Sequence, residues 1–317
     1  TNGTICVGTY FCGLVSYDGT NWIVYNTLNS GLPANDIWAL AIDTNGNIWV
    51  GTIGGGLVSF NGTNWTVYNP SNSGIPDNSV FSIAIDSEGV KWIGSHTGLT
   101  KYDGVSWTTY NASNSNLTFD NITSIAIDND GTKWIGSSYS GGLAAFDGTD
   151  WILYDTSNSD LPDNHIYSIA VDNNGVKWIG TQSKGLAAFD GTNWTVYNGT
   201  NSGLPDDEQI TSIAFDSIGT KWIGTHAGLG VYNEDGIPFF VEENRIAGQN
   251  VKIYPNPSNG YLSFKLLDNS KAYSIEIIDG QGKIVVSQIL ANDQNTIDIK
   301  NLPYGIYIVR VNTNKGT

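Results

Sequence analysis

The sequence predicts an all-β chain in which a β-propeller precedes a small immunoglobulin-like β-sandwich. Tryptophans recur about every 43 residues over residues 1–241, and each complete repeat contains four short strand-like runs. Residues 251–317 carry a different strand pattern without that repeat. Four strands in each unit of roughly 43 residues is the pattern of a propeller blade. No stretch shows the apolar period of about 3.6 residues that predicts a helix.

Two series of tryptophans mark the repeat. The first series is Trp22, Trp65, Trp107, Trp151 and Trp194, and the second is Trp49, Trp92, Trp134, Trp178 and Trp222. Only Trp38 lies outside both series. A residue that recurs in every unit has a role common to all units, such as packing. We therefore expect both series to pack between blades and not to bind a ligand.

Residues 80–110 illustrate one complete unit. Alternation in VFSIAID predicts the innermost strand, with Phe81, Ile83 and Ile85 on one face. The runs KWIGS, GLTKYD and SWTTY predict the second, third and outermost strands. Turns rich in Asp and Gly separate them. In this order, the loops between second and third strands and the linkers between blades share one end of the propeller, which we call the upper rim.

The number of blades follows from the predicted second strands. Six of them begin at Cys6, Trp49, Trp92, Trp134, Trp178 and Trp222. TNGTICVGT at 1–9 aligns with TNGNIWVGT at 44–52, so the first blade is expected to lack its inner strand. The sixth outermost strand is expected at 237–244. The pattern favours a ring of six blades and leaves open a truncated ring of seven, or further blades upstream.

Cys6 and Cys12 flank the first predicted hairpin turn. Pairing Thr9 with Cys12 sets Cys6 opposite Val15, an offset that separates the two Cα atoms by more than the ~7 Å that a disulfide allows. This register disfavours a disulfide, and the two cysteines do not identify a redox compartment.

The charge of the chain is uneven. Residues 1–241 carry six lysines, no arginine and 23 acidic residues, a net charge of −17, whereas residues 242–317 carry a net charge of +1. An acidic first part repels phosphate backbones and anionic lipids, which excludes nucleic-acid and membrane-surface partners. No apolar run approaches the ~20 residues that span a bilayer, so no membrane insertion is expected.

The acidic residues do not predict a catalytic or metal site. An aspartate ends the inner strand of every complete blade, namely Asp43, Asp86, Asp128, Asp172 and Asp216. Their D-x-x-G spacing and their recurrence predict a role in turns. Asp206, Asp207 and Glu208 are interpreted as solvated linker residues, with acid–base chemistry or calcium binding as the alternative. No Ser-His-Asp order, P-loop or HExxH motif is present, and no other cofactor is expected.

Ligand recognition is expected where the repeats differ, which is chiefly in the loops between second and third strands. The candidate ligand-binding residues on these loops are Tyr10, Phe11, His96, Tyr139, Gln182, Lys184 and His226. Aromatic rings can stack on sugars and the polar groups can donate hydrogen bonds, which predicts a shallow site at the upper mouth of the channel. Ordinary loop variation is the alternative. His96 and His226 are expected on opposite blades, too far apart to share a zinc ion with His165.

One motif recurs along the blades. An inner strand ending in Asp is followed by Gly, by W-[IV]-G-[TS] and by GL, as in AIDTNGNIWVGTIGGGL at 41–57 and AIDNDGTKWIGSSYSGGL at 126–143. These residues resemble the two-component regulator propeller family. Propellers of that family often precede a membrane helix and a histidine kinase and sense extracellular glycans. The resemblance implies the fold but not the signalling role, because this sequence contains neither of those parts.

Residues 251–317 carry three motifs in a fixed order. These are Tyr254-Pro255-Asn256-Pro257 with Gly260, then IEIIDGQGKIV at 275–285, then LPYGIYIVRV at 302–311. They resemble the type A C-terminal sorting domain of the type IX secretion system, although the usual last strand with basic residues is missing. The resemblance implies export, removal of the domain by a sortase-like peptidase, and release or anchoring at the outer surface of a Gram-negative bacterium. Residues 242–250 are then a linker.

Three functions are compatible with these observations. The first is a non-enzymatic exported module that binds an extracellular glycan or protein. The second is an enzyme that acts on polysaccharide with acidic residues on the upper face of the propeller. The third is a structural spacer at the cell surface without a ligand. The variable loops and the resemblance of residues 251–317 to a sorting domain together favour the first function.

Overall fold

The computed structural model describes residues 4–202, 204, 209–216, 219–232, 239–242, 251–254, 261–266, 272–279, 283–290, 296–302 and 307–313. Every regular element in these ranges is a strand, as predicted. The chain divides into two compact units, Thr1–Glu242 and Glu243–Thr317. Among the described residues, no helix has the length and apolarity that crossing a bilayer requires.

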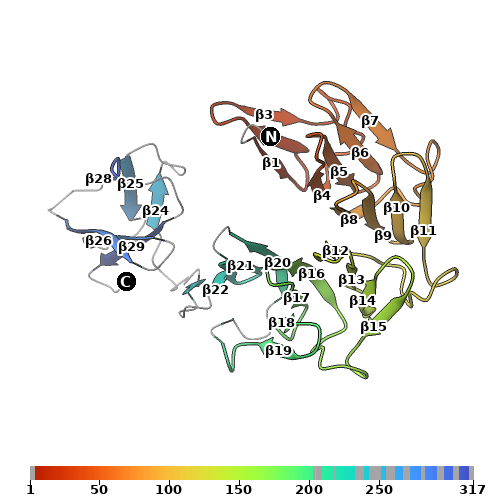
Figure 1. The fold of residues 1–317 in the computed structure, drawn as a ribbon. Coiled ribbons are helices and arrows are strands. Elements are labelled where there is room, and N and C mark those ends of the chain that lie inside the picture. The colour runs from red at the N-terminus through yellow and green to blue at the C-terminus, as the bar shows by residue number, and fades with distance from the viewer. Residues whose placement is uncertain are drawn as a thin grey trace. The chain divides into compact units, whose positions relative to one another are not determined.

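The first unit consists of six antiparallel sheets, which are the blades of a propeller (Figure 1). Blade 1 contains β1 (Ile5–Gly8), β2 (Leu14–Tyr17) and β3 (Trp22–Tyr25), and blade 2 contains β4 (Ile37–Ile42), β5 (Ile48–Thr52), β6 (Leu57–Phe60) and β7 (Trp65–Tyr68). Blade 3 contains β8 (Val80–Ile85), β9 (Lys91–Ser95), β10 (Gly98–Tyr102) and β11 (Trp107–Tyr110), and blade 4 contains β12 (Ser124–Ile127), β13 (Lys133–Ser137), β14 (Gly142–Phe146) and β15 (Trp151–Tyr154). Blade 5 contains β16 (Ile166–Val171), β17 (Lys177–Thr181), β18 (Leu186–Phe189) and β19 (Trp194–Tyr197), and blade 6 contains β20 (Ile210–Phe215), β21 (Lys221–Thr225), β22 (Gly228–Tyr232) and β23 (Phe239–Glu242).

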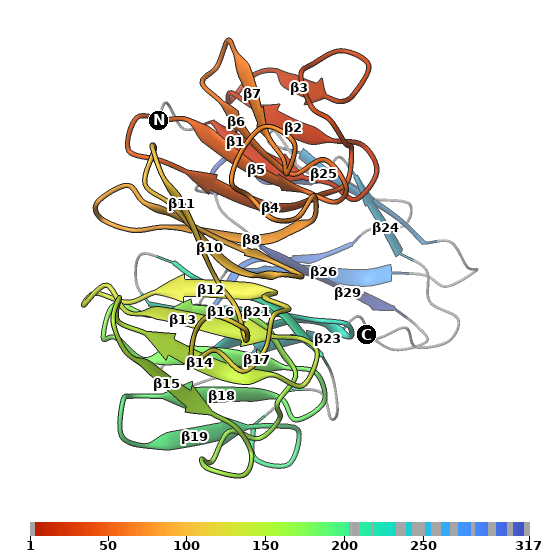
Figure 2. The ribbon, with the colours of Figure 1, turned by 90° about the vertical axis from the view of Figure 1, so that its right-hand side faces the viewer.

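The blades follow one another around a central axis in chain order. The inner strands β4, β8, β12, β16 and β20 contact their neighbours in that sequence. Figure 2 shows the same sheets from the side, where successive blades lie side by side. Because each blade is a meander whose strands pair with their chain neighbours, all loops between second and third strands emerge at the upper rim.

Asp43 shows how the repeated aspartates shape each blade. Its Oδ1 accepts hydrogen bonds from the backbone N–H groups of Asn45 and Asn47 at 3.0 and 2.9 Å, and its Oδ2 accepts one from the indole Nε1 of Trp49 at 3.0 Å. The aspartates of blades 3, 4, 5 and 6 bind the corresponding indoles at 2.9, 2.9, 2.9 and 3.4 Å. The predicted turn role is confirmed, and the carboxylate also fixes the tryptophan of the adjacent strand.

The second-strand tryptophans lie between blades, as predicted. Trp49 is 5% exposed and packs with Val80 and Ile93 of the next blade. The Nζ of Lys91, from that next blade, lies 4.8 Å from the centroid of the Trp49 ring, and the same lysine–tryptophan pairing recurs between later blades. The outer-strand tryptophans of blades 2 to 5 stack within their own blade and also contact a tyrosine of the preceding blade, as Trp65 does with Phe60 at 4.0 Å and with Tyr25 at 5.4 Å. Apolar packing and cation–π attraction therefore act together at each blade interface.

The inner strands depart from the predicted alternation in one respect. Val80 pairs with Ser95 and Ser82 pairs with Gly94, so Phe81 is an extra residue in a β-bulge. Val80, not Phe81, therefore shares a packed face with Ile83 and Ile85. The prediction that Phe81 lies on that face is wrong, because an inserted residue reverses the alternation on one side of the bulge.

Among the residues that the structure describes, blade 1 contains three strands and no inner strand, as predicted. The predicted hairpin register is wrong by one residue, because Gly8 pairs with Leu14 and Cys6 therefore lies opposite Ser16. Cys6 and Cys12 are both free thiols, and burial raises the pKa of Cys6.

The second unit is a sandwich of two three-stranded sheets. One sheet contains β24 (Val251–Tyr254), β25 (Tyr261–Leu266) and β28 (Thr296–Asp298), and the other contains β27 (Ile284–Ile289), β26 (Ala272–Ile278) and β29 (Ile308–Thr313). Phe264 and Ile297 from the first sheet share a core cluster with Ile275 and Val311 from the second. Of the predicted sorting motif, Tyr254 ends β24, whereas Pro255, Asn256, Pro257 and Gly260 lie outside the described residues, as does most of the 242–250 linker.

Candidate functional site

Bulges in the inner strands of blades 2, 3, 5 and 6 each place one extra residue at the upper rim. The extra residue is Trp38 in β4, Phe81 in β8, Tyr167 in β16 and Thr211 in β20. A bulge residue has no partner in the ladder, so its side chain is freed from the regular alternation of the strand. Trp38 is accordingly 52% exposed, although it is a large apolar side chain on an inner strand.

Aromatic rings of blades 1 to 3 form a continuous run along this rim. Phe11 and Tyr10 meet edge to face with their centroids 4.2 Å apart. Tyr10 lies 6.2 Å from Trp38, and Trp38 lies 5.6 Å from Phe81. Phe81 in turn contacts the imidazole of His96 at 4.4 Å. We call these five side chains the aromatic run.

Most of the aromatic run is open to solvent. Phe11 is 70% exposed, and Tyr10 and Trp38 are also exposed. Exposed aromatic rings in contiguous contact are unusual on a surface that faces only water, because their burial would be favourable. The far end of the run is polar, since the side-chain amide of Asn121 lies 2.6 Å from Nδ1 of His96. The run therefore offers ring faces followed by hydrogen-bonding groups.

The other predicted site residues lie on the same set of loops but not in this run. Tyr139 is exposed on the loop between β13 and β14, and Gln182 and Lys184 are exposed on the loop between β17 and β18. His226 is exposed between β21 and β22. The structure thus brings Tyr10, Phe11 and His96 together through two residues that the sequence interpretation did not select. The cluster at 206–208 lies outside the described residues.

Trp38 and Phe81 could have been found from the sequence. The residue at this position differs from blade to blade and is Trp38, Phe81, Tyr167 or Thr211 in the bulged strands and Thr123, directly before β12, in blade 4. The same variation between blades identified the candidate residues in the loops. It identifies Trp38 and Phe81 when it is applied to the strands as well.

A second group of polar side chains lies on blades 4 and 5. Asp163, His165 and Ser140 are linked in that order, with 2.9 Å between Asp163 Oδ1 and His165 Nδ1 and 2.5 Å between His165 Nε2 and Ser140 Oγ. In the sequence these residues come in the order Ser140, Asp163 and His165, and two separate loops supply them. No short sequence motif therefore marks the group. Burial raises the pKa of Asp163, but hydrogen bonds from His165 and Ser183 outweigh it and hold the pKa below its usual value.

These polar clusters do not form a metal site. His96 and His165 are engaged in separate clusters. Within the described ranges, no group of three or more histidine, cysteine, aspartate or glutamate side chains is placed to hold a metal ion.

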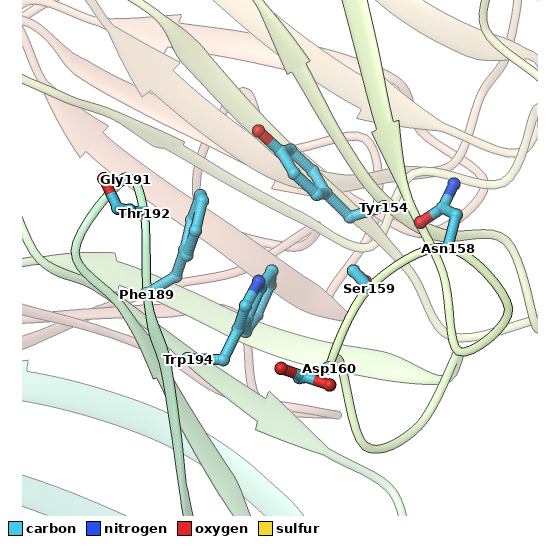
Figure 3. Close-up of a pocket in the computed structure, with 8 residues that line it drawn as sticks. All are labelled: Tyr154, Asn158, Ser159, Asp160, Phe189, Gly191, Thr192 and Trp194. Carbon is cyan, nitrogen blue, oxygen red and sulfur yellow. The ribbon is translucent and has the colours of Figure 1, made fainter.

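A shallow cavity of roughly 530 Å³ lies between blades 4 and 5 and is lined by no residue of either cluster. Figure 3 shows the rings of Phe189 and Trp194 side by side, with Tyr154 and Asp160 nearby. Phe189 and Trp194 are stacked at 4.4 Å, so the cavity adjoins the repeated packing of a blade. Asp160 takes the place that Gly31 and Gly74 have in earlier linkers, where each glycine lies against an outer-strand tryptophan.

Family models match both units of the chain. Residues 31–54 and 160–183 match the two component regulator propeller, and residues 252–317 match the secretion system C-terminal sorting domain. No curated protein sequence matches the chain.

Solved structures share the fold. The extracellular domain of the hybrid two component system BT3049 from B. thetaiotaomicron is 19% identical with a TM-score of 0.64, and the match covers 100% of this chain and 53% of that one. PorZ, a surface component of the type-IX secretion system of Porphyromonas gingivalis, is 20% identical with a TM-score of 0.57, covering 99% of this chain and 57% of that one. This chain therefore spans little more than half the length of either protein. Virginiamycin B lyase from Staphylococcus aureus is 12% identical with a TM-score of 0.59, covering 80% and 84%.

Identities this low establish the fold alone, and the fold occurs both in enzymes and in proteins that are not enzymes. The C-terminal domain is more informative, because its family model describes a domain that sorts proteins for a secretion system. The chain carries two-component regulator propeller repeats followed by a type IX secretion sorting domain, and it is secreted or held at the outer surface of a Gram-negative bacterium.

Proposed function

We propose that the propeller binds an extracellular glycan along the aromatic run, where the bound glycan undergoes no reaction, and that the C-terminal domain delivers the protein to the cell surface. The observation that carries this proposal is the contiguous series of rings from Phe11 to His96, in which all but the half-buried Phe81 are exposed. Sugar rings present apolar C–H faces that pack on aromatic side chains, while their hydroxyls need nearby donors and acceptors.

Charge favours a neutral glycan over a polyanionic one. The propeller region carries a net charge of −17 over residues 1–241, which repels sulfated or uronic polymers. The nearest polar groups on the run are the imidazole of His96 and the amide of Asn121. These groups suit hydroxyls, because an amide and an imidazole ring both exchange hydrogen bonds with them.

Titration calorimetry with a panel of neutral oligosaccharides tests the proposal. Replacing Trp38 by alanine should weaken binding by about 2 kcal/mol, which is roughly 30-fold in Kd, because truncating a central aromatic anchor removes a large part of the binding energy. Trp22→Ala is the matched control, since Trp22 is 59% exposed but stacks on Tyr17 in blade 1 and takes no part in the run.

Three results would contradict the proposal. Equal losses from Trp38→Ala and Trp22→Ala would show that the run does not bind the ligand. A loss only in Trp194→Ala would move the site to the cavity between blades 4 and 5. Binding of no oligosaccharide by the folded protein would favour the spacer function.

A further inference from the structure

The linked side chains of Asp163, His165 and Ser140 have the arrangement of a nucleophile, its base and the group that orients the base. His165 presents Nδ1 to the Asp163 carboxylate at 2.9 Å, so this nitrogen carries the proton and Nε2 is the acceptor. Ser140 Oγ lies 2.5 Å from Nε2 and is placed to donate its proton there. This is the hydrogen-bond sequence of a serine hydrolase triad, which is recognised by geometry and not by chain order.

The Asp163 carboxylate is itself fixed. Oδ1 also accepts the backbone N–H of His165 at 3.0 Å, and Oδ2 accepts the backbone N–H and the hydroxyl of Ser183 at 3.2 and 3.1 Å. The two loops that meet here are joined by backbone bonds, since Gly142 N–H donates to Asn164 C=O at 2.8 Å. The orienting group and the base therefore lie on a braced part of the rim.

Ser140 has the backbone of a strained position. Its φ is +61°, the one positive φ at a non-glycine residue in the part of the chain that the structure describes. Such a conformation costs about 1–2 kcal/mol and tends to occur at functional sites. The hydroxyl is exposed, and no hydrogen bond in the described ranges engages the N–H of the following residue, Gly141. In known nucleophile turns the N–H after the serine stabilises the oxyanion.

We propose that Ser140 is a nucleophile that hydrolyses carboxylic esters, with His165 as the general base and Asp163 as the positioning residue. Ser140 Oγ attacks the ester carbonyl while His165 Nε2 takes its proton, which gives a tetrahedral oxyanion. The intermediate collapses as the C–O bond to the alcohol breaks and Nε2 returns the proton to the leaving oxygen. Water then attacks the acyl-serine with Nε2 again as the base, releasing the acid and restoring the hydroxyl.

An ester is the acyl compound that this open site suits. Ser140 and Tyr139 are exposed, and the shallow cavity between blades 4 and 5 is lined by other residues. Little substrate surface is therefore buried, and little binding energy is available to lower the barrier. Esters need less activation than amides because the alkoxide is the better leaving group. This activity is independent of glycan binding on the aromatic run.

A fluorophosphonate probe tests the nucleophile directly on the whole chain. The probe should label a single serine, which peptide mass spectrometry should identify as Ser140. Ser140→Ala should abolish labelling, and His165→Ala should slow it by about 10³-fold, because removing the base of such a unit disables the nucleophile. Ser138→Ala is the matched control on the same loop and should be labelled at the rate of the unaltered protein.

Asp163 requires a separate variant because its loss could also disturb the loop. Asp163→Asn should slow labelling by at least 10²-fold, and Asp163→Glu should restore part of the rate. Thermal unfolding of each variant, followed by tryptophan fluorescence, checks that the propeller is folded. The proposal is overturned if the folded, unaltered protein is not labelled, or if Ser140→Ala is labelled as fast as Ser138→Ala.

Discussion

At the scale of single residues, the most repeated interaction is the one between an aspartate and the indole of the following strand. In blade 2, Asp43 accepts hydrogen bonds from two backbone N–H groups, from the Asn47 side chain and from Trp49. Burial raises the pKa of Asp43, but the hydrogen bonds from Trp49 and Asn47 outweigh it and the pKa is lowered overall. The charged form is therefore the one that holds the turn and the indole together.

A lowered pKa makes this contribution depend on pH in a definite direction. The carboxylate should stabilise the propeller fully above about pH 4, where the unfolded chain is already ionised, and its contribution should fade as the pH drops through the lower folded pKa. Asp43→Asn should cost about 1–3 kcal/mol at pH 7, and the difference from the unaltered protein should shrink below pH 4. Urea unfolding followed by tryptophan fluorescence measures this, because every tryptophan lies in residues 22–222.

Asp130→Asn is the control for this experiment, because Asp130 is exposed in a turn of the same type. It should change the free energy of unfolding by less than about 0.5 kcal/mol at every pH. A difference between Asp43→Asn and the unaltered protein that stayed constant from pH 7 to pH 3 would mean that the charge of Asp43 is not what stabilises the turn.

At the scale of elements, the second strand of each of blades 1 to 5 carries a glycine that lets the next blade approach. A Cβ placed on Gly180 would lie 2.6 Å from Ile210 Cγ2 in the inner strand of blade 6 and 2.3 Å from Ser168 Oγ. Gly51 and Gly136 have the same relation to Val80 and Ile166. These distances are shorter than packed atoms tolerate, so the glycine sets the spacing between blades.

Gly180→Ala should therefore destabilise the propeller by about 1–3 kcal/mol through overpacking at the interface of blades 5 and 6. Gly175→Asn is the matched control in the same blade, because Gly175 has a φ of +78° and no atom within 4 Å of its would-be Cβ. Asparagine tolerates that conformation, so the control should cost less than about 1 kcal/mol. If Gly180→Ala and Gly175→Asn lowered the free energy of unfolding in urea equally, the blades could move apart to accept the added methyl group without an energetic cost.

The element scale also shows which features the sequence could predict. Strand order and the Asp–Trp pairing follow from a repeat, because a feature that recurs in every copy is seen several times in one sequence. The bulges at Trp38 and Phe81 were missed, since one inserted residue leaves the composition of the strand unchanged. The Ser140–His165 contact was missed because two loops 25 residues apart create it, and no local pattern records which loops meet.

At the scale of the whole propeller, the two ends of the blade series differ from its interior. Val7 in β1 is 43% exposed, whereas Val50 at the same position in blade 2 is fully buried. Leu229 in blade 6 is exposed, whereas its counterpart Leu186 in blade 5 is buried. The three atoms nearest to a Cβ on Gly224 all belong to its own blade. In blade 1, the edge of β1 and the apolar face that carries Val7 are therefore exposed. In blade 6, the exposed apolar face is the one that carries Leu229.

An inner strand supplied to blade 1 should stabilise the first unit. Placing the sequence of residues 36–43, DIWALAID, directly before Thr1 recreates the junction that joins β4 to β5. Pairing with β1 and covering Val7 should raise the Tm of the tryptophan signal by about 5 °C, taking 2–4 °C per kcal/mol for a unit of this size. Amide exchange in Ile5–Gly8 should slow in parallel at alternate residues, because the N–H groups of β1 that point away from β2 gain partners. An extension of equal length in which the two isoleucines and the leucine are changed to serine controls for length alone. Equal Tm values for the two extensions would show that the β1 edge does not accept a strand.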